Sequence, residues 1–254
     1  MLRSVRFRLI ALFACLLAAS CAGPGVSSSN VSTSTSNSGR PDYWGHRPGP
    51  QGFDTVIIDA GHGGKDDGAK SRTTGQKEKD LALDTAKRLQ RQLGGRVKTQ
   101  LMRNDDRFIE LDDRAARASG KSNTILISIH YNSSSSAIRG PETYYWRVDS
   151  HGLATRLQRG MTAVSPAESG NRGMVRRRLR LTRNPDIPCV LVEVGYLSNA
   201  SEARLCADPS YRDKMAAAIA RAILDQKAQG DAGTGPLPRP INAPPSRPTD
   251  APGS

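Results

Sequence analysis

Cysteine is scarce in this chain, with four in 254 residues. Cys15 and Cys21 lie near the N-terminus, so only Cys189 and Cys206 fall in a region with the composition of a folded domain. Their spacing from each other and from the histidines is unlike that of a cysteine-rich zinc site. If the chain is exported, a disulfide between them is permitted, and two buried free thiols fit the sequence equally well.

The chain also lacks an apolar run of the about 20 residues that a membrane-spanning helix needs. Residues 9–19 are apolar but too few, and three arginines precede them. This order is typical of a secretory signal and predicts a signal peptide over 1–20. The small residues before Cys21 resemble a bacterial lipoprotein cleavage site, which predicts that Cys21 is lipidated; ordinary cleavage nearby is the alternative. Because Ala22 follows, we expect an outer-membrane lipoprotein on the periplasmic side of a two-membrane envelope.

Negative charge is in short supply. Lysine and arginine number 37 against 24 acidic residues, a formal charge of +13 at pH 7. A basic exported protein favours anionic partners such as cell-wall polymers, lipopolysaccharide or a membrane surface, and export argues against nucleic acid. Six arginines between Arg172 and Arg183 form either a solvated basic face or a substrate-facing patch. The sequence leaves both interpretations open.

Two segments of simple composition flank a region that can bury a core. Residues 21–52 are rich in Ser, Thr, Asn, Pro and Gly, which predicts a flexible tether. Residues 230–254 are rich in Pro and Gly, which predicts a disordered tail. The folded domain is therefore expected over 53–229, a length ample for one core.

The central region alternates strand-like and helix-like segments. Expected strands cover 55–59, 97–102, 124–129, 143–148 and 190–195, and expected helices cover 80–93, 111–118, 151–164 and 211–226. This alternation predicts an α/β three-layer domain, with a largely parallel mixed sheet flanked by helices. Such sheets hold their functional sites where the strands end.

Two of the four histidines follow predicted strands. His62 stands between glycines after the first strand, and His130 comes directly after strand 124–129. Glu193 lies near the end of the last strand, and Glu78 lies just before the first helix. Two histidines and a carboxylate are a ligand set of catalytic zinc that leaves a position for water, whose pKa the ion lowers. A second carboxylate can then carry the proton of that water to a leaving amine.

Each of these residues also has a structural interpretation. A histidine at a strand end is often only hydrogen-bonded in place, and Glu78 could cap the first helix. Glu193 is harder to explain structurally, because a carboxylate among valines and leucine is costly to bury without a partner. His151 precedes a predicted helix and is interpreted as a surface or capping residue.

Five blocks carry a resemblance to a known family. They are Asp59–Ala69, Glu78–Leu81, Met102–Asp106, Ser128–Asn132 and Leu191–Asn199. In order and spacing they resemble the zinc-dependent N-acetylmuramoyl-L-alanine amidases of the third amidase family. The resemblance covers nearly all of 53–224, and Ala60 stands where that family commonly has proline.

The resemblance implies that His62, Glu78 and His130 bind Zn²⁺ and that Glu193 is the catalytic carboxylate. It implies a zinc amidase domain over 53–229 that cleaves peptidoglycan between N-acetylmuramic acid and L-alanine, in cell-wall remodelling or cell separation. Arg183 falls in a block that the family shares, and we expect it to contact substrate. Asn132 is expected to support His130 or to contact substrate.

Members of the family that act in cell division carry a long insertion after the strand that corresponds to 143–148. Only Asp149 and Ser150 stand there in this chain. We therefore expect no inhibitory helix of that kind, and activity would be limited by tethering, substrate access or an unknown activator. The alternatives are a non-catalytic peptidoglycan-binding lipoprotein on the same fold and a zinc hydrolase acting on another wall bond.

Overall fold

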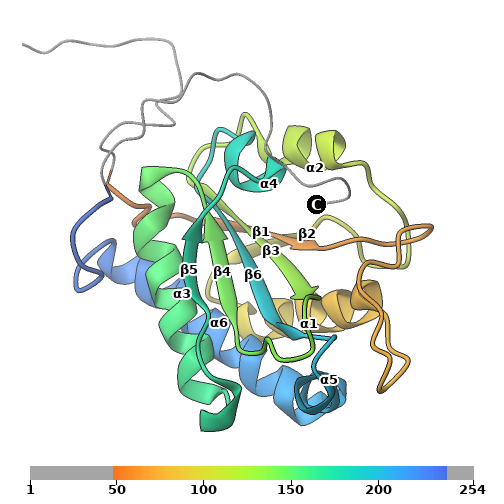
Figure 1. The fold of residues 1–254 in the computed structure, drawn as a ribbon. Coiled ribbons are helices and arrows are strands. Elements are labelled where there is room, and N and C mark those ends of the chain that lie inside the picture. Colours follow the sequence, from red (N-terminus) through yellow and green to blue (C-terminus); the bar gives the residue numbers. More distant parts are fainter. Residues whose placement is uncertain (1–47, 239–254) are drawn as a thin grey trace, which may run out of the picture. The chain divides into compact units, whose positions relative to one another are not determined.

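The computed structural model describes residues 48–238 (Figure 1). The predicted signal peptide, Cys21 and most of the predicted tether lie outside the described residues. Within them, six strands form one mixed sheet in the order β2-β1-β3-β6-β4-β5. The strands are β1 (Thr55–Ala60), β2 (Lys98–Leu101), β3 (Thr124–Asn132), β4 (Glu142–Tyr145), β5 (Gly173–Arg176) and β6 (Cys189–Tyr196). All neighbouring pairs are parallel except β4 and β6, which confirms the predicted sheet.

Helices cover both faces of this sheet and complete three layers (Figure 1). One face packs against α1 (Glu78–Leu93), α3 (His151–Val164) and α6 (Pro209–Gln229). The other carries the shorter α2 (Leu111–Ala118) and α4 (Arg180–Arg183). The connections include α5 (Ala200–Ala207) and the 3-10 turns η1 (Val148–Ser150) and η2 (Ala167–Ser169).

Side-chain alternation along β3 places its polar side chains on one face of the sheet. Ile125, Ile127 and Ile129 point into the main core beneath α1 and α6. Because successive side chains of a strand point to opposite faces, Ser128 and His130 point to the face that carries α2 and α4. β1 and β6 follow the same rule, so their polar residues share that face.

The bounds of two predicted strands need correction, and three elements were not predicted. β3 continues through Asn132 instead of ending at Ile129, because its pairing with β6 continues to the end of that strand; His130 therefore lies within the strand. The strand predicted over 143–148 is Glu142–Tyr145, since its pairing with β6 ends at Tyr145 and η1 begins after two intervening residues. β5, α4 and α5 were not predicted.

The predicted domain boundaries are too narrow at both ends. The amide of Gly49 donates to Asp231 at 2.6 Å, and the amide of Gly52 donates to the carbonyl of Lys227 at 2.8 Å. Thr234 is buried, and Arg156 donates to the carbonyl of Ala232 at 2.6 Å. Glycine-rich composition gave no sign of this packing, because backbone groups supply most of the contacts.

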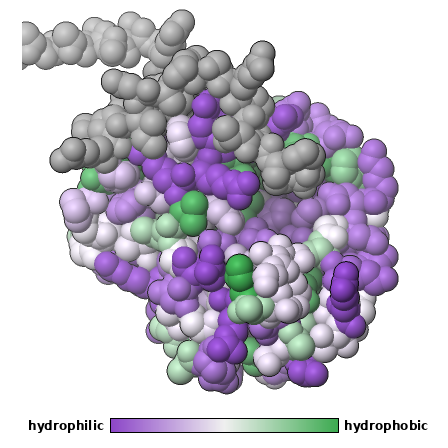
Figure 2. Space-filling model, in the orientation of Figure 1, coloured by the Kyte–Doolittle hydropathy of each residue, from purple (hydrophilic) through white to green (hydrophobic). Residues whose placement is uncertain are grey.

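The outer surface of the domain is more hydrophilic than its buried core. On the face drawn in Figure 2, most of the surface is hydrophilic, and hydrophobic residues occur as small separate patches. Within residues 48–238, no helix is long and apolar enough to cross a membrane.

Candidate active site

The loop after β1 carries His62 in an unusual backbone conformation. His62 has φ +57°, in the left-handed region that non-glycine residues seldom adopt. Gly61 precedes it, and a Cβ at Gly61 would lie 2.4 Å from Cε1 of His130. Glycine is therefore required there, because it lets the loop pass directly against the second histidine.

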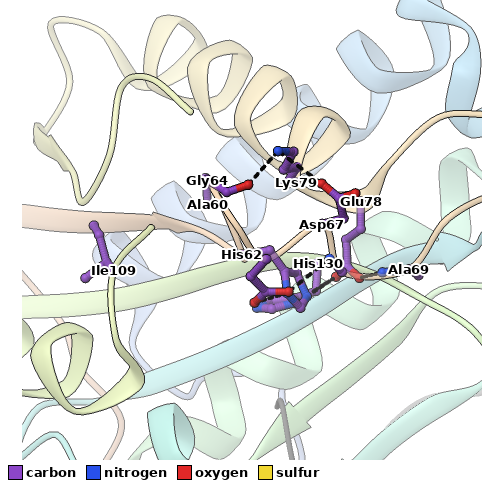
Figure 3. Close-up of polar contacts among 12 residues, drawn as sticks. Ala60, His62, Gly64, Asp67, Ala69, Glu78, Lys79, Ile109 and His130 are labelled. Carbon is purple, nitrogen blue, oxygen red and sulfur yellow. Dashed lines mark hydrogen bonds and ion pairs between the residues drawn. The ribbon is translucent and has the colours of Figure 1, made fainter. Parts of the chain in front are cut away.

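The buried Arg103 fixes the start of this loop. Its guanidinium donates to the carbonyl oxygens of Ala60 at 2.9 Å, of Gly61 at 2.7 Å and of Lys79 at 2.8 Å. These bonds satisfy backbone oxygens that the loop removes from the sheet. They also join the His62 loop to the first turn of α1, where Lys79 in turn donates to the carbonyl of Gly64 (Figure 3).

A second buried arginine holds the loop from the side of α2. Arg114 pairs with the fully buried Asp59 at 2.6 Å and donates to the carbonyls of Ala60 at 2.8 Å and His62 at 2.6 Å. Asp59 also accepts a hydrogen bond from the hydroxyl of Ser128 at 2.7 Å. The backbone at His62 is therefore fixed by two cations that the sequence analysis did not identify.

His62 from the loop after β1, Glu78 from the start of α1 and His130 from within β3 converge on one another (Figure 3). Each offers one ligand atom, and these atoms lie within 4.8 Å of one another. Glu78 Oε1 is 3.0 Å from His62 Nε2 and 2.8 Å from His130 Nδ1. The structure thus brings together, from the loop after β1, from α1 and from β3, the three residues that the sequence predicted as ligands.

Further contacts fix the orientation of two of these groups. Asp66 Oδ2 lies 2.7 Å from His62 Nδ1, which leaves Nε2 facing Glu78. The amides of Ala69 and Tyr131 donate to the two oxygens of Glu78 at 2.8 and 3.0 Å. Glu78 is the first residue of α1, where its charge also suits the helix N-terminus, but its carboxylate bonds to groups outside that helix. Asp66 is a supporting residue of the kind found behind metal-binding histidines.

The electrostatics of these groups are strongly coupled. Burial disfavours the ionised form of Glu78, but hydrogen bonds from His130 and His62 outweigh it and hold the Glu78 pKa well below its usual value. Burial likewise disfavours protonated His62, but Glu78 and then Asp66 outweigh it and raise the His62 pKa to about 8. The site therefore stabilises positive charge between these side chains.

Glu193 lies beside the three convergent residues. It pairs in register with His130 across β3 and β6 and with Glu142 across β6 and β4. Its side chain is buried, and Oε2 has no hydrogen-bond partner. Burial, followed by the negative charges of Glu78 and Glu142, raises the Glu193 pKa well above its usual value. A buried carboxylate oxygen without a partner is costly unless a ligand or ion completes it.

Glu142 was not identified from the sequence. Its carboxylate accepts hydrogen bonds from the hydroxyls of Tyr144 at 2.8 Å and Tyr196 at 2.5 Å. Because β4 runs antiparallel to β6, this second buried carboxylate is brought opposite Glu193. Only that strand pairing, and no local sequence signal, places the two together.

A cleft of about 470 Å³ opens over these residues. Asn132 lines it, but its amide group contacts the hydroxyl of Tyr196 and its own chain rather than His130. Arg183 is not among the residues that line this cleft. From the arginine-rich segment it is Arg177 that reaches the cleft. A smaller cleft of about 240 Å³ adjoins it and shares His62, His130 and Asp66.

Two other groups considered from the sequence lie elsewhere. Cys189 and Cys206 are buried free thiols, not a disulfide, and burial raises the pKa of both. His151 begins α3, packs its ring edge-to-face on Tyr145 with centroids 5.4 Å apart, and takes no part in the His62 cluster.

Comparisons with known proteins agree with this geometry. The model of the Amidase_3 family, N-acetylmuramoyl-L-alanine amidase, matches residues 56–225. A protein named probable cell wall amidase LytH, from Staphylococcus epidermidis, is 35% identical over 170 residues, which are 65% of this chain and 55% of that protein. The chain thus spans about half the length of that relative.

Two solved structures share the fold. An N-acetylmuramoyl-L-alanine amidase from Clostridium difficile 630 is 33% identical, with a TM-score of 0.64 over 69% of this chain and 97% of that one. The CwlD amidase from Clostridioides difficile, solved in complex with the GerS lipoprotein, is 29% identical, with a TM-score of 0.64 over 68% and 97%. On the extent of the family match and these similarities, the chain belongs to the Amidase_3 family of N-acetylmuramoyl-L-alanine amidases.

Proposed function

We propose that this protein is a zinc-dependent peptidoglycan amidase that cleaves the amide between N-acetylmuramic acid and the first L-alanine of the stem peptide. The observation that carries the proposal is the convergence of His62, Glu78 and His130 beside a buried carboxylate oxygen of Glu193 that has no partner.

The three convergent residues fit a zinc ion. Two imidazole nitrogens and one carboxylate oxygen are a ligand set of catalytic zinc. Asp66 behind His62 and the two amides behind Glu78 orient these donors as metal sites require. A zinc ion held there supplies Lewis acidity, which polarises a carbonyl group and acidifies water.

Glu193 is the group that moves the proton. Glu193 lines the cleft and its Oε2 has no hydrogen-bond partner, so this carboxylate can accept a proton from an attacking water and deliver it to the alanine nitrogen as the amide bond breaks. Burial beside other carboxylates makes Glu193 hold a proton more readily than an ordinary glutamate does.

The two clefts that meet at the histidines support a polymeric substrate. They share His62, Asp66 and His130, so the scissile amide can lie at the metal ligands while the chain extends into both. A non-catalytic wall-binding role remains the alternative. It would leave the unpartnered oxygen of Glu193 unexplained, and a peptidase or deacetylase would be distinguished only by its products.

The cellular setting follows from the terminal sequence. We propose that residues 1–20 are removed, that the lipidated Cys21 anchors the protein to the outer membrane, and that the segment after it tethers the catalytic domain to the periplasmic side. CwlD was solved in complex with a lipoprotein, which supports the proposal that a partner protein binds this domain.

Digestion of purified sacculi by the full-length protein tests the proposal. Released products are identified by mass spectrometry, with and without a chelator, and after zinc is restored. We expect free stem peptides that begin with L-alanine, lost with chelator and recovered with zinc. Cleavage within the peptide, loss of acetate, or release that a chelator leaves unchanged would contradict the proposal.

A further inference from the structure

Arg177 stands at the rim of the active-site cleft, one residue beyond β5. Its backbone amide donates to the carbonyl of Tyr145 at 2.9 Å, which continues the pairing of β5 with β4. Alternation from Val175 turns the Arg177 side chain to the sheet face that carries Glu193. Its guanidinium carbon lies 5.9 Å from the ring centroid of Tyr144, and both residues line the cleft.

Tyr144 gives this arginine a fixed support. The Tyr144 ring is buried against Leu179 and Leu191, and its hydroxyl donates to Glu142 at 2.8 Å. A guanidinium stacked over a fixed aromatic ring loses less conformational freedom when it binds a ligand than a free side chain does. Arg177 remains exposed, and in the described part of the chain no carboxylate contacts its guanidinium.

Arg177 differs in charge from the acidic side chains that line the cleft. Among the described lining residues, Asp66, Glu78 and Glu193 are acidic, whereas Arg177 is the one lysine or arginine. A basic side chain at the rim attracts an anionic group of a bound substrate. Arg177 is the group that can supply this attraction.

We propose that Arg177 forms a subsite for a carboxylate of the stem peptide. The inference rests on the proposed function, because that reaction determines which anion is present. In the substrate the sugar is uncharged and its lactyl carboxyl is part of the scissile amide, so the carboxylates belong to the peptide. Arginine can hold a carboxylate through two parallel hydrogen bonds, and this geometry selects carboxylate over amide.

A pair of substrates that differ by one charge tests the subsite. The full-length zinc-loaded protein is assayed on N-acetylmuramoyl-L-alanyl-D-glutamate with its γ-carboxyl blocked as a methylamide and its α-carboxyl free, and on the same compound with the α-carboxyl amidated, which carries no carboxylate. Arg177→Gln is compared with Arg177→Lys and with Arg221→Gln, an exposed arginine on α6 outside this cleft. We expect Arg177→Gln to lower kcat/KM about tenfold for the acid and less than about twofold for the amide, since an arginine–carboxylate bond is charge-assisted. Arg177→Lys should recover part of the loss, and Arg221→Gln should change neither substrate.

A tripeptide pair, with the carboxylate of the third residue free or amidated, identifies the source of the anion. If Arg177→Gln lowers kcat/KM selectively for the charged compound in the tripeptide pair and not in the dipeptide pair, the carboxylate of the third residue occupies the subsite. An equal loss on charged and amidated substrates, or no loss at all, would overturn the proposal.

Calorimetric binding of the same compounds to Glu193→Gln gives an answer that does not depend on turnover. Arg177→Gln should weaken binding of the acid selectively in that background. If neither compound is hydrolysed at the muramoyl bond, the proposed function fails, and the ratio of acid to amide binding still decides whether Arg177 holds a carboxylate.

Discussion

Replacing Arg114 by methionine should damage both the fold and the metal site. Methionine keeps much of the aliphatic volume and removes four hydrogen bonds, to Ile109, Asp59, Ala60 and His62. The change leaves a fully buried Asp59 carboxylate with the Ser128 hydroxyl as its remaining side-chain donor.

The expected loss of stability can be estimated from the burial of this pair. The side chains of Arg114 and Asp59 are 3% and 0% exposed, so solvent cannot replace the lost partner. Breaking such a pair costs about 3–5 kcal/mol of unfolding free energy. In a domain of this size that corresponds to a fall in Tm of about 6–20 °C. Because the backbone of His62 loses a donor as well, zinc affinity should fall about 10- to 100-fold.

Thermal unfolding followed by circular dichroism, with zinc titration by calorimetry below the Tm, measures both effects. Arg117→Met is the matched control, since Arg117 is one turn along α2 and exposed. The double variant Asp59→Asn/Arg114→Met should cost less than the sum of the two single changes by at least about 0.5 kcal/mol. A Tm within about 2 °C of wild type for Arg114→Met, or strict additivity, would refute the reasoning.

Three further predictions concern the site and its location. Glu193→Gln should keep zinc but lower turnover at least about 100-fold, and near-normal release of stem peptides would exclude the proton-transfer role. Because His62 must be unprotonated to bind a metal and its pKa is raised to about 8, zinc affinity should rise about 50-fold from pH 6 to pH 8, with proton release in calorimetry; an affinity independent of pH would contradict this. Cys21→Ala should move the protein from the membrane to the soluble envelope fraction, and unchanged membrane association would argue against lipidation.

The buried parallel strands were predictable because their sequences are almost entirely apolar and rich in β-branched residues. β1, β3 and β6 are apolar, β-branched runs that read as strands buried on both faces. β5 was missed because it is a short edge strand of four half-buried residues that ends in arginine. α5 did carry a readable signal, since Asn199 caps it by accepting bonds from the amides of Ser201 and Glu202.

The site was predictable where its residues end strands or begin a helix. The placement of His62 and His130 at one sheet edge follows from parallel topology, whereas the assignment of Glu78 as a ligand and Glu193 as the catalytic carboxylate came only from the family resemblance and stays a prediction. The position of Glu142 opposite Glu193 could not be predicted, because it depends on an antiparallel register between distant segments. The pairing of β4 with β5 brings Arg177 beside Tyr144, and because β5 was not predicted, the sequence could not single out Arg177 among the arginines of its segment.

Anomalous diffraction at the zinc absorption edge, from crystals of the protein grown with zinc, tests the central claim most directly. The account predicts one strong peak bounded by His62 Nε2, His130 Nδ1 and the Glu78 carboxylate, with Glu193 facing it but not bound to it. A zinc ion held by Glu193 in place of Glu78, or no peak at this site in a protein that cleaves peptidoglycan, would contradict it.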